Sequence, residues 1–110
     1  MTTETVSLVP LNEGNDVYLV LDELMTFGRV WRELSEEAAN EQTVLELIAN
    51  GEFRRPTRVI VFNTAEGWSR DETVNIGFKL LEMSREGRVL VPAANELVER
   101  TTGQVPTLLA

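Results

Sequence analysis

The first clear pattern of apolar and polar positions along the chain alternates with a period of two. Val17, Leu19 and Leu21 would lie on one face of a strand, and Tyr18 and Val20 would lie on the other. A strand that is apolar on both faces is typical of the interior of a sheet. We therefore expect this segment to form a central strand.

A second strand is predicted at residues 29–33, where charged side chains surround Val30 and Trp31. Arginines on a strand oppose pairing with a further strand, so this one should form an edge of the sheet. Two interpretations of Trp31 stay open. It is a core residue if the N-terminal segment covers it, and an interface residue if it is exposed.

A third strand is predicted at residues 58–62. Its run from Val59 to Phe62 is rich in β-branched side chains and has no polar interruption, which is typical of a strand covered on both faces. One face would pack on helices. The other could be covered by the last helix, by the N-terminal segment or by a second copy of the protein, and the last arrangement would make a homodimer.

The segment after this strand carries the start signals of a helix. Ser69 and Glu72 have the spacing of a capping box, in which each side chain bonds a backbone N–H that has no partner within the helix. This pattern predicts a strand-to-helix loop at residues 63–68 and a helix from Arg70 to about Glu86. Apolar residues predict the buried stripe of that helix; they are Val74, Ile76, Phe78, Leu80, Leu81 and Met83.

Another helix is predicted between the second and third strands. Residues 44–48 carry apolar side chains at helical spacing, and Gly51 stands where a helix end favours a left-handed residue. Ser35 and Asn40 are both good N-caps, so this helix could begin after either of them.

The last helix should begin at Pro92, because the fixed φ of proline suits a first turn, and it should reach about Arg100. Residues 88–91 before it form either a short strand or an extended link. Residues 5–9 are a further candidate strand.

The predicted order is strand, strand, helix, strand, helix, helix. A hairpin followed by a helical crossover predicts an α+β fold, with a small mixed sheet of three to four strands and helices packed mainly on one face. The length of 110 residues suits a single domain. We expect that domain at residues 16–103, after a flexible arm or edge strand at 1–15 and before a frayed tail at 104–110.

Cysteine and histidine are both missing from the sequence. Disulfides, thiolate nucleophiles, imidazole catalysts and Cys or His zinc sites are therefore excluded. Asp22 and Glu66 could offer oxygen ligands to Mg²⁺, but no DxD-like cluster supports such a site. We expect no metal and no cofactor, and a non-enzymatic role more than an enzymatic one.

The net charge is −8, from 18 acidic and 10 basic residues. This balance disfavours bare nucleic acid and anionic membranes, and it suits a basic partner. Arg54, Arg55 and Arg58 form a local basic cluster, which either pairs with glutamates inside the molecule or contacts RNA or a phosphoprotein. Neither a secretory signal nor a membrane-spanning apolar run is recognised, so we expect a cytoplasmic protein.

The candidate site is the expected loop with its borders; its residues are Asn63, Thr64, Glu66, Gly67, Trp68, Ser69 and Arg70. Trp68 beside Arg70 is the kind of pair enriched at protein interfaces, unless Trp68 is buried as a hydrophobic staple. The leading hypothesis is a protein-interaction or regulatory module whose partner is another protein or a second copy of the chain. The alternative is a small anionic ligand, with or without catalysis, bound by Arg70 and the free N–H groups of the helix start.

Three segments, at residues 17–22, 28–33 and 61–71, resemble a group of short uncharacterised bacterial proteins typical of proteobacteria. The block from Phe62 to Asp71, which reads FNTAEGWSRD, is quite specific. The resemblance covers roughly residues 16–90. It implies a bacterial cytosolic origin and brings no known activity with it.

Overall fold

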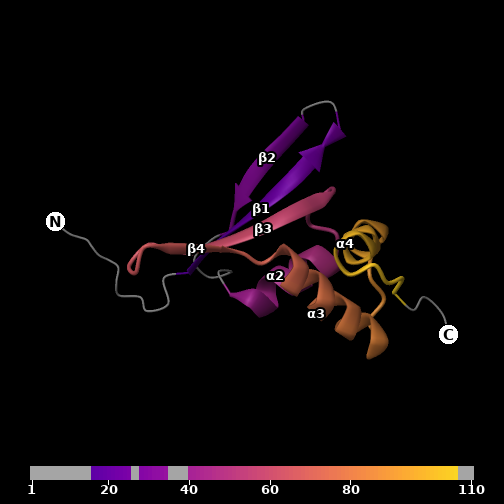
Figure 1. Ribbon diagram of the computed structural model, residues 1–110. Coiled ribbons are helices and arrows are strands. Elements are labelled where there is room, and N and C mark those ends of the chain that lie inside the picture. Colours follow the sequence, from indigo (N-terminus) through magenta and orange to yellow (C-terminus); the bar gives the residue numbers. More distant parts are fainter. Residues whose placement is uncertain (1–15, 26–27, 35–39, 107–110) are drawn as a thin grey trace.

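The computed structural model describes residues 16–25, 28–34 and 40–106 (Figure 1). A four-stranded sheet and three helices lie within them, which confirms the α+β class. The strands are β1 (Asp16–Leu24), β2 (Gly28–Glu33), β3 (Pro56–Asn63) and β4 (Trp68–Asp71), and the helices are α2 (Glu41–Ala49), α3 (Thr73–Arg85) and α4 (Pro92–Thr102). The expected arm at 1–15, with its candidate strand at 5–9, and the candidate cap Ser35 lie outside the described residues.

The strands lie in the order β2-β1-β3-β4, and every neighbouring pair is antiparallel. β1 is therefore central and β2 is an edge strand, as the sequence predicted. The expectation of a mixed sheet was wrong. β2 and β3 do run in the same direction, but β1 lies between them, so no parallel pair forms.

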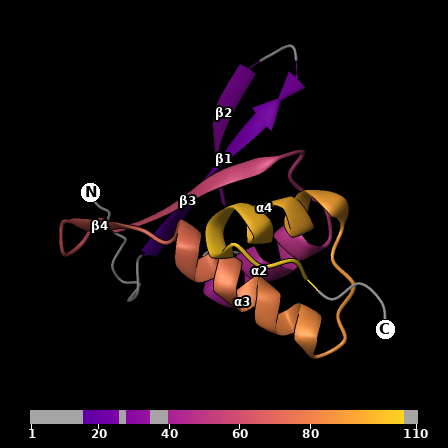
Figure 2. The same ribbon diagram turned by 45° about the vertical axis from the view of Figure 1, so that its right-hand side comes forward.

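All three helices lie on one side of the sheet (Figures 1 and 2), as predicted. Tyr18, Val20, Val59 and Val61 are buried on that side. They share one hydrophobic core with the helices, whose members in it are Val44, Leu45, Ile48, Ala49, Ile76, Leu80, Leu81, Ala94, Leu97 and Val98. Burial of these side chains against the sheet is the main force that holds the helices to it.

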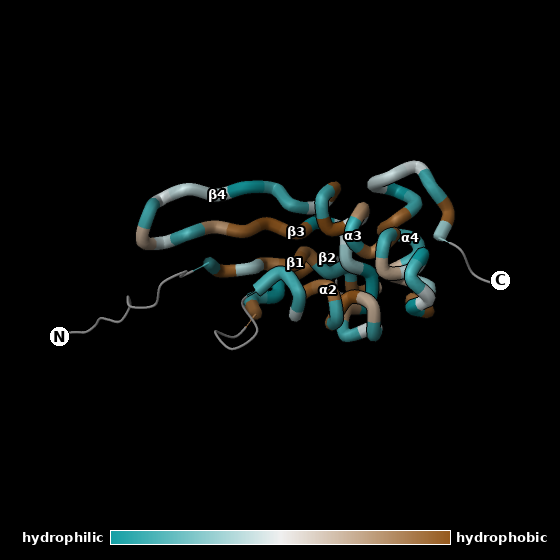
Figure 3. The backbone as a smooth tube through the Cα atoms, turned by 90° about the horizontal axis from the view of Figure 1, so that it is seen from below, coloured by the Kyte–Doolittle hydropathy of each residue, from teal (hydrophilic) through white to brown (hydrophobic). Residues whose placement is uncertain are grey.

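The other side of the sheet carries the alternate residues of β1 and β3, and none of the described helices covers it. In Figure 3 the backbone of β1 and β3 is largely hydrophobic, whereas β4 is hydrophilic. Val17 is opposite Phe62 and Leu19 is opposite Ile60, while Leu21 is opposite Trp31 of β2. Residues that are directly opposite share a face. We call these six side chains the helix-free face; five are partly buried, and Trp31 is 50% exposed.

The ends of α2 follow the local sequence signals. Asn40 is the N-cap, and its Oδ1 accepts a hydrogen bond from the backbone N–H of Thr43 at 2.9 Å. Gly51 follows the helix with a φ of 87°, a left-handed conformation that glycine adopts without strain. The apolar stripe predicted at 44–48 faces the core, with Val44, Leu45 and Ile48 buried.

The start of α3 differs from the prediction. Its N-cap is Glu72, which makes no capping hydrogen bond with its side chain, so the capping box with Ser69 was wrong. Asp71 serves this end instead, because its Oδ1 accepts a hydrogen bond from the Thr73 N–H at 2.9 Å. Residues 68–71, expected in the loop and first helical turn, form strand β4.

The buried stripe of α3 is also rotated from the predicted one. Val74 and Phe78 are 54% and 45% exposed, whereas they were expected in the core. The physical reason is Gly77, which lies so close to α4 that a Cβ added to it would be 2.8 Å from the Cβ of Thr101. The Gly77 side of the helix therefore packs inward, and Val74 and Phe78 turn toward solvent.

α4 begins at Pro92, as predicted. The preceding link at residues 88–91 forms no strand; Val91 is extended, and its N–H donates to the Ala49 carbonyl at 3.3 Å. Beyond the helix, Pro106 is buried. Within the described part of the chain, no helix is long and apolar enough to cross a membrane.

Candidate functional site

The residues singled out from the sequence lie on a hairpin between β3 and β4. Asn63 and Trp68 are the last paired residues, and 64–67 form the turn. The Gly67 N–H donates to the Asn63 carbonyl at 2.8 Å, and Gly67 has a φ of 73°. The chain thus returns along β3 before α3 begins, so the expected strand-to-helix loop is a strand-to-strand turn.

The side chain of Asn63 holds this turn and ties it to β1. Its Oδ1 accepts a hydrogen bond from the Glu66 N–H at 2.7 Å, and its Nδ2 donates to Asp16 at 2.9 Å. Such local bonding is typical of asparagine at turns. Asn63 is therefore a structural residue of the hairpin, whereas Thr64 at the tip is exposed.

Trp68 and Arg70 stack on one another on the side of β4 that faces the helices. The Arg70 guanidinium lies 4.4 Å from the centre of the Trp68 ring, which is cation–π geometry. Trp68 packs against the edge of the core, and its Nε1 donates to Glu66 at 2.8 Å. Arg70 also donates to Glu72 at 2.6 Å. Trp68 is thus partly buried and partly available for contact, and it does not form a staple at the start of α3.

Ser69 points to the other side of the hairpin. It is exposed and lies opposite Phe62, so it borders the helix-free face. The two sides of β4 therefore present different chemistry. One carries the stacked Trp68 and Arg70, and the other extends the apolar sheet surface.

The donors expected to bind an anion already have partners within the protein. Arg70 is held by Trp68 and Glu72, and the Thr73 N–H by Asp71. Burial raises the pKa of Asp71, but hydrogen bonds from Thr73 and from Arg58 outweigh burial and leave that pKa below its usual value. The carboxylate of Asp71 therefore already places a negative charge at the start of α3, and none of these contacts favours the binding of an additional anion.

A chain of polar contacts leads from the hairpin to the helices. Asn75 donates to Glu72 at 2.8 Å and to Glu41 at 2.9 Å, and Lys79 donates to Glu41 at 2.9 Å. Tyr18 is buried nearby. Its pKa is raised, first by burial and then by the charges of Glu41, Asp16 and Glu72, while Arg70 opposes them.

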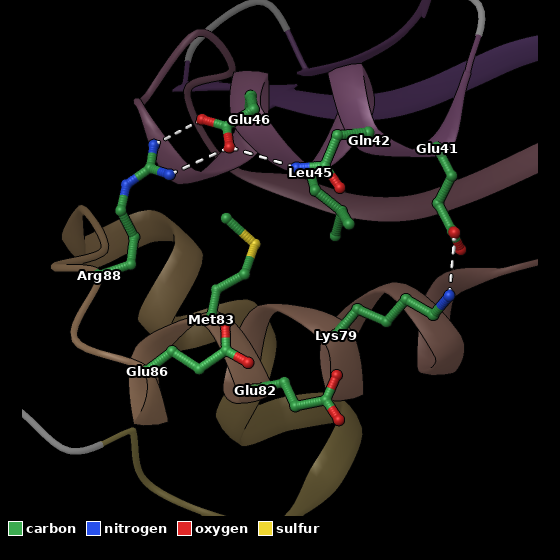
Figure 4. A pocket seen from close by; sticks show the side chains of 9 residues that line it. All are labelled: Glu41, Gln42, Leu45, Glu46, Lys79, Glu82, Met83, Glu86 and Arg88. Carbon is green, nitrogen blue, oxygen red and sulfur yellow. Dashed lines mark hydrogen bonds and ion pairs between the residues drawn. The ribbon is translucent and has the colours of Figure 1, made fainter.

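A groove of about 480 Å³ lies between α2 and α3 (Figure 4). Leu45 and Met83 form its apolar part, and ion pairs join the two sides at both ends: Glu41 with Lys79 at 2.9 Å, and Glu46 with Arg88 at 2.8 Å. The hydrogen bond from Arg88 lowers the pKa of Glu46. This groove could not be predicted from the sequence, because its two walls are far apart along the chain and no local pattern joins them.

A second hollow, of about 770 Å³, lies where the segment after α2 meets the start of α4. Phe53, Val91 and Pro92 form part of its lining. Asp22 fixes this segment, because its fully buried carboxylate accepts hydrogen bonds from the N–H groups of Arg54 at 3.1 Å and Arg55 at 2.7 Å.

The remaining partners of Asp22 and of the basic cluster are also within the protein. Arg32 donates to Asp22 at 3.0 Å. Arg55 pairs with Glu23 and Glu96, and Arg58 pairs with Asp71. Arg55 and Arg58 therefore pair with acidic side chains inside the molecule, which was one of the two interpretations of the basic cluster. Among the described residues, no group of three or more acidic side chains is arranged to hold a metal ion.

The helix-free face is a further feature that could not be placed from the sequence. The alternation in β1 and the apolar run in β3 did show that both faces of each strand are apolar. Only the strand register shows that their second faces join into one surface, and only the helix positions show that none of the described helices covers it.

Comparisons of this chain with models of known protein families, with curated proteins and with solved structures gave no match.

Proposed function

We propose that this protein is a non-enzymatic protein-interaction module that binds its partner through the helix-free face. The observation that carries this proposal is the set of Val17, Leu19, Leu21, Ile60 and Phe62, with the exposed Trp31 beside them, on a side of the sheet without a described helix. The proposal also includes a location in the cytoplasm of a bacterium, which the resemblance of the block at residues 62–71 supports.

The solvent-facing side of an antiparallel sheet normally carries polar residues, because it is in contact with water. Here it carries apolar side chains on two adjacent central strands, and contiguous apolar surface of this kind marks interaction sites. Trp31 adds a large aromatic side chain at the edge, the residue type most enriched among binding hot spots.

The β3–β4 hairpin borders this surface and supports the same function. Ser69 extends the helix-free face, and the stack of Trp68 on Arg70 holds two interface-prone side chains in a fixed arrangement. Preorganised side chains lose less conformational entropy on binding. We therefore include Ser69 in the contact surface, and we place Trp68 and Arg70, which lie on the opposite side of the edge strand β4, at its outer rim.

Site-specific photo-crosslinking tests the proposal. A photoreactive amino acid at Leu19 or Phe62 should give a covalent adduct with a protein partner in living bacteria. The same group at Glu99, an exposed residue of α4, is the matched control and should give none. Equal adducts from Glu99, or none from either face position in a folded protein, would contradict the proposal.

A second variant locates the border of the surface. Trp68→Ala combined with Arg70→Ala should lower the yield of the Leu19 adduct if the hairpin contributes to binding. An unchanged yield would remove the hairpin from the contact surface and leave the sheet face as its only part.

A further inference from the structure

We infer that the helix-free face binds the same face of a second copy of this chain and forms a twofold symmetric dimer. This inference rests on the proposed function and names its partner. A twofold contact of this type is self-complementary, because each residue of the surface meets the same surface on the other copy.

Charge is the first argument for a second copy. Two molecules that each carry −8 repel one another, so they associate most easily where the local charge is near zero. The charged side chains around the helix-free face are nearly balanced: Arg29 and Arg58 against Glu23, Glu33 and Asp71. By contrast, four glutamates and two basic residues line the groove between α2 and α3.

Three of these five border charges already have a partner of opposite charge within the protein. Arg58 is already paired with Asp71, and Glu23 with Arg55. Burying a charge without a partner is what makes a charged interface costly. An apolar centre with internally paired charges at its rim therefore suits contact with an identical surface.

The strand register is the second argument. A twofold axis that lies between the sheets, along the strands and midway between β1 and β3, places Leu19 of each copy over Ile60 of the other, and Val17 over Phe62. Apolar side chains therefore meet apolar side chains along the centre of the contact. Trp31 is on the outer strand β2, so it then lies at the β4 edge of the other sheet.

The size of the surface sets the expected strength. Four strands about 4.8 Å apart and some seven residues long span roughly 19 by 23 Å. This area of about 440 Å² is roughly half of the 800 Å² that a stable interface buries on each partner, so the contact belongs to the weak, transient class. We therefore expect a reversible dimer with a dissociation constant on the order of 100 micromolar or weaker.

Light scattering over a series of protein concentrations tests the inference. The mass of the unmodified protein should rise from monomer to dimer with concentration. Trp31→Glu changes an exposed side chain and should leave the fold intact, while weakening the dimer at least tenfold; Leu19→Glu should act in the same way at the centre. Val89→Glu is the matched control, because Val89 is 81% exposed on the link before α4, and it should leave the dimer unchanged.

The absence of cysteine allows a second, geometric readout. Leu19→Cys or Ile60→Cys introduces a single thiol, and a short bismaleimide should then join two copies through that position. Val89→Cys should give no such product. Only a twofold contact of this face brings one residue close to its own copy at both positions.

The outcomes separate this inference from the proposed function. A protein that stays monomeric at every concentration would overturn the dimer, while a crosslink from Leu19 to a different protein would still support the interaction module. A dimer that survives Trp31→Glu and gives no crosslink at Leu19 or Ile60 would also overturn the inference, because it would use another surface.

Discussion

At the scale of single residues, the carboxylate of Asp22 joins three parts of the structure. It projects from β1, accepts two backbone hydrogen bonds from the segment before β3, and binds Arg32 of β2. The side chain is fully buried, whereas that of Arg32 is 43% exposed. The two backbone bonds should therefore matter more for stability than the ion pair.

We predict that Asp22→Asn lowers the free energy of unfolding by about 2–4 kcal/mol, because the amide turns an N–H group toward a backbone donor that then lacks an acceptor. Arg32→Gln should cost only about 1 kcal/mol, since its charge is screened by solvent. Urea denaturation measures both values. Equal losses would show that the ion pair is the dominant contact.

Tyr18 should titrate above its ordinary pKa of 10.0, because burial and three nearby carboxylates oppose its ionisation. It is the single tyrosine of the chain, so absorbance of the tyrosinate ion reports it directly. The unfolded chain loses this proton near pH 10, whereas the folded protein keeps it. Below pH 10, neutral Tyr18 therefore makes its full contribution to the free energy of unfolding. This contribution should fall as the pH rises above 10. Normal titration of the folded protein would contradict this.

At the scale of secondary structure, the contact between α3 and α4 depends on Gly77. We predict that Gly77→Ala lowers the free energy of unfolding by about 1–2 kcal/mol, although alanine favours helix by about 1 kcal/mol. The added methyl group would overlap with Thr101. Thermal or urea unfolding measures the loss.

Two companion variants give this experiment its controls. Glu82→Ala, at an exposed position of the same helix, should have little effect on stability. Thr101→Ala in the Gly77→Ala background should recover part of the loss, because it removes the Thr101 hydroxyl that the new methyl group meets. A Gly77→Ala protein that is more stable than the unmodified one would contradict the close packing.

Local patterns in the sequence were sufficient for most elements. β1, α2 and α4 follow from apolar periodicity and from Asn40, Gly51 and Pro92. β4 could not be predicted in this way, since its strand character comes from pairing with β3. The spacing of Ser69 and Glu72 indicated a capping box, but pairing of β4 with β3 overrode this local signal.

The candidate site shows the same limit. Asn63 to Arg70 were identified together because they are continuous in sequence, and they remain together on the hairpin. The helix-free face combines residues from β1, β2 and β3, so it depends on register. The groove between α2 and α3 depends on helix packing, which also turned Val74 and Phe78 outward against their apolar pattern.

At the scale of the whole molecule, the net charge and the apolar contact surface act in opposite directions on self-association. We predict that the proposed dimer becomes severalfold tighter between 50 and 500 mM NaCl. Salt screens the repulsion between two copies that each carry −8, and it leaves an apolar interface intact. Sedimentation or light scattering at both salt concentrations measures the change. Weaker association at high salt would mean that ion pairs across the interface hold the dimer.

The central position of β1 also has a consequence during synthesis. β1 can pair with β2 as soon as both have left the ribosome, but its other edge pairs with β3, where Asp16 meets Asn63. At about 5–20 residues per second, the ribosome needs roughly 2–9 seconds to make the chain between these two residues. During that time the backbone N–H and C=O groups along one edge of β1 have no strand to pair with. β3 pairs with this edge only after α2 has been made.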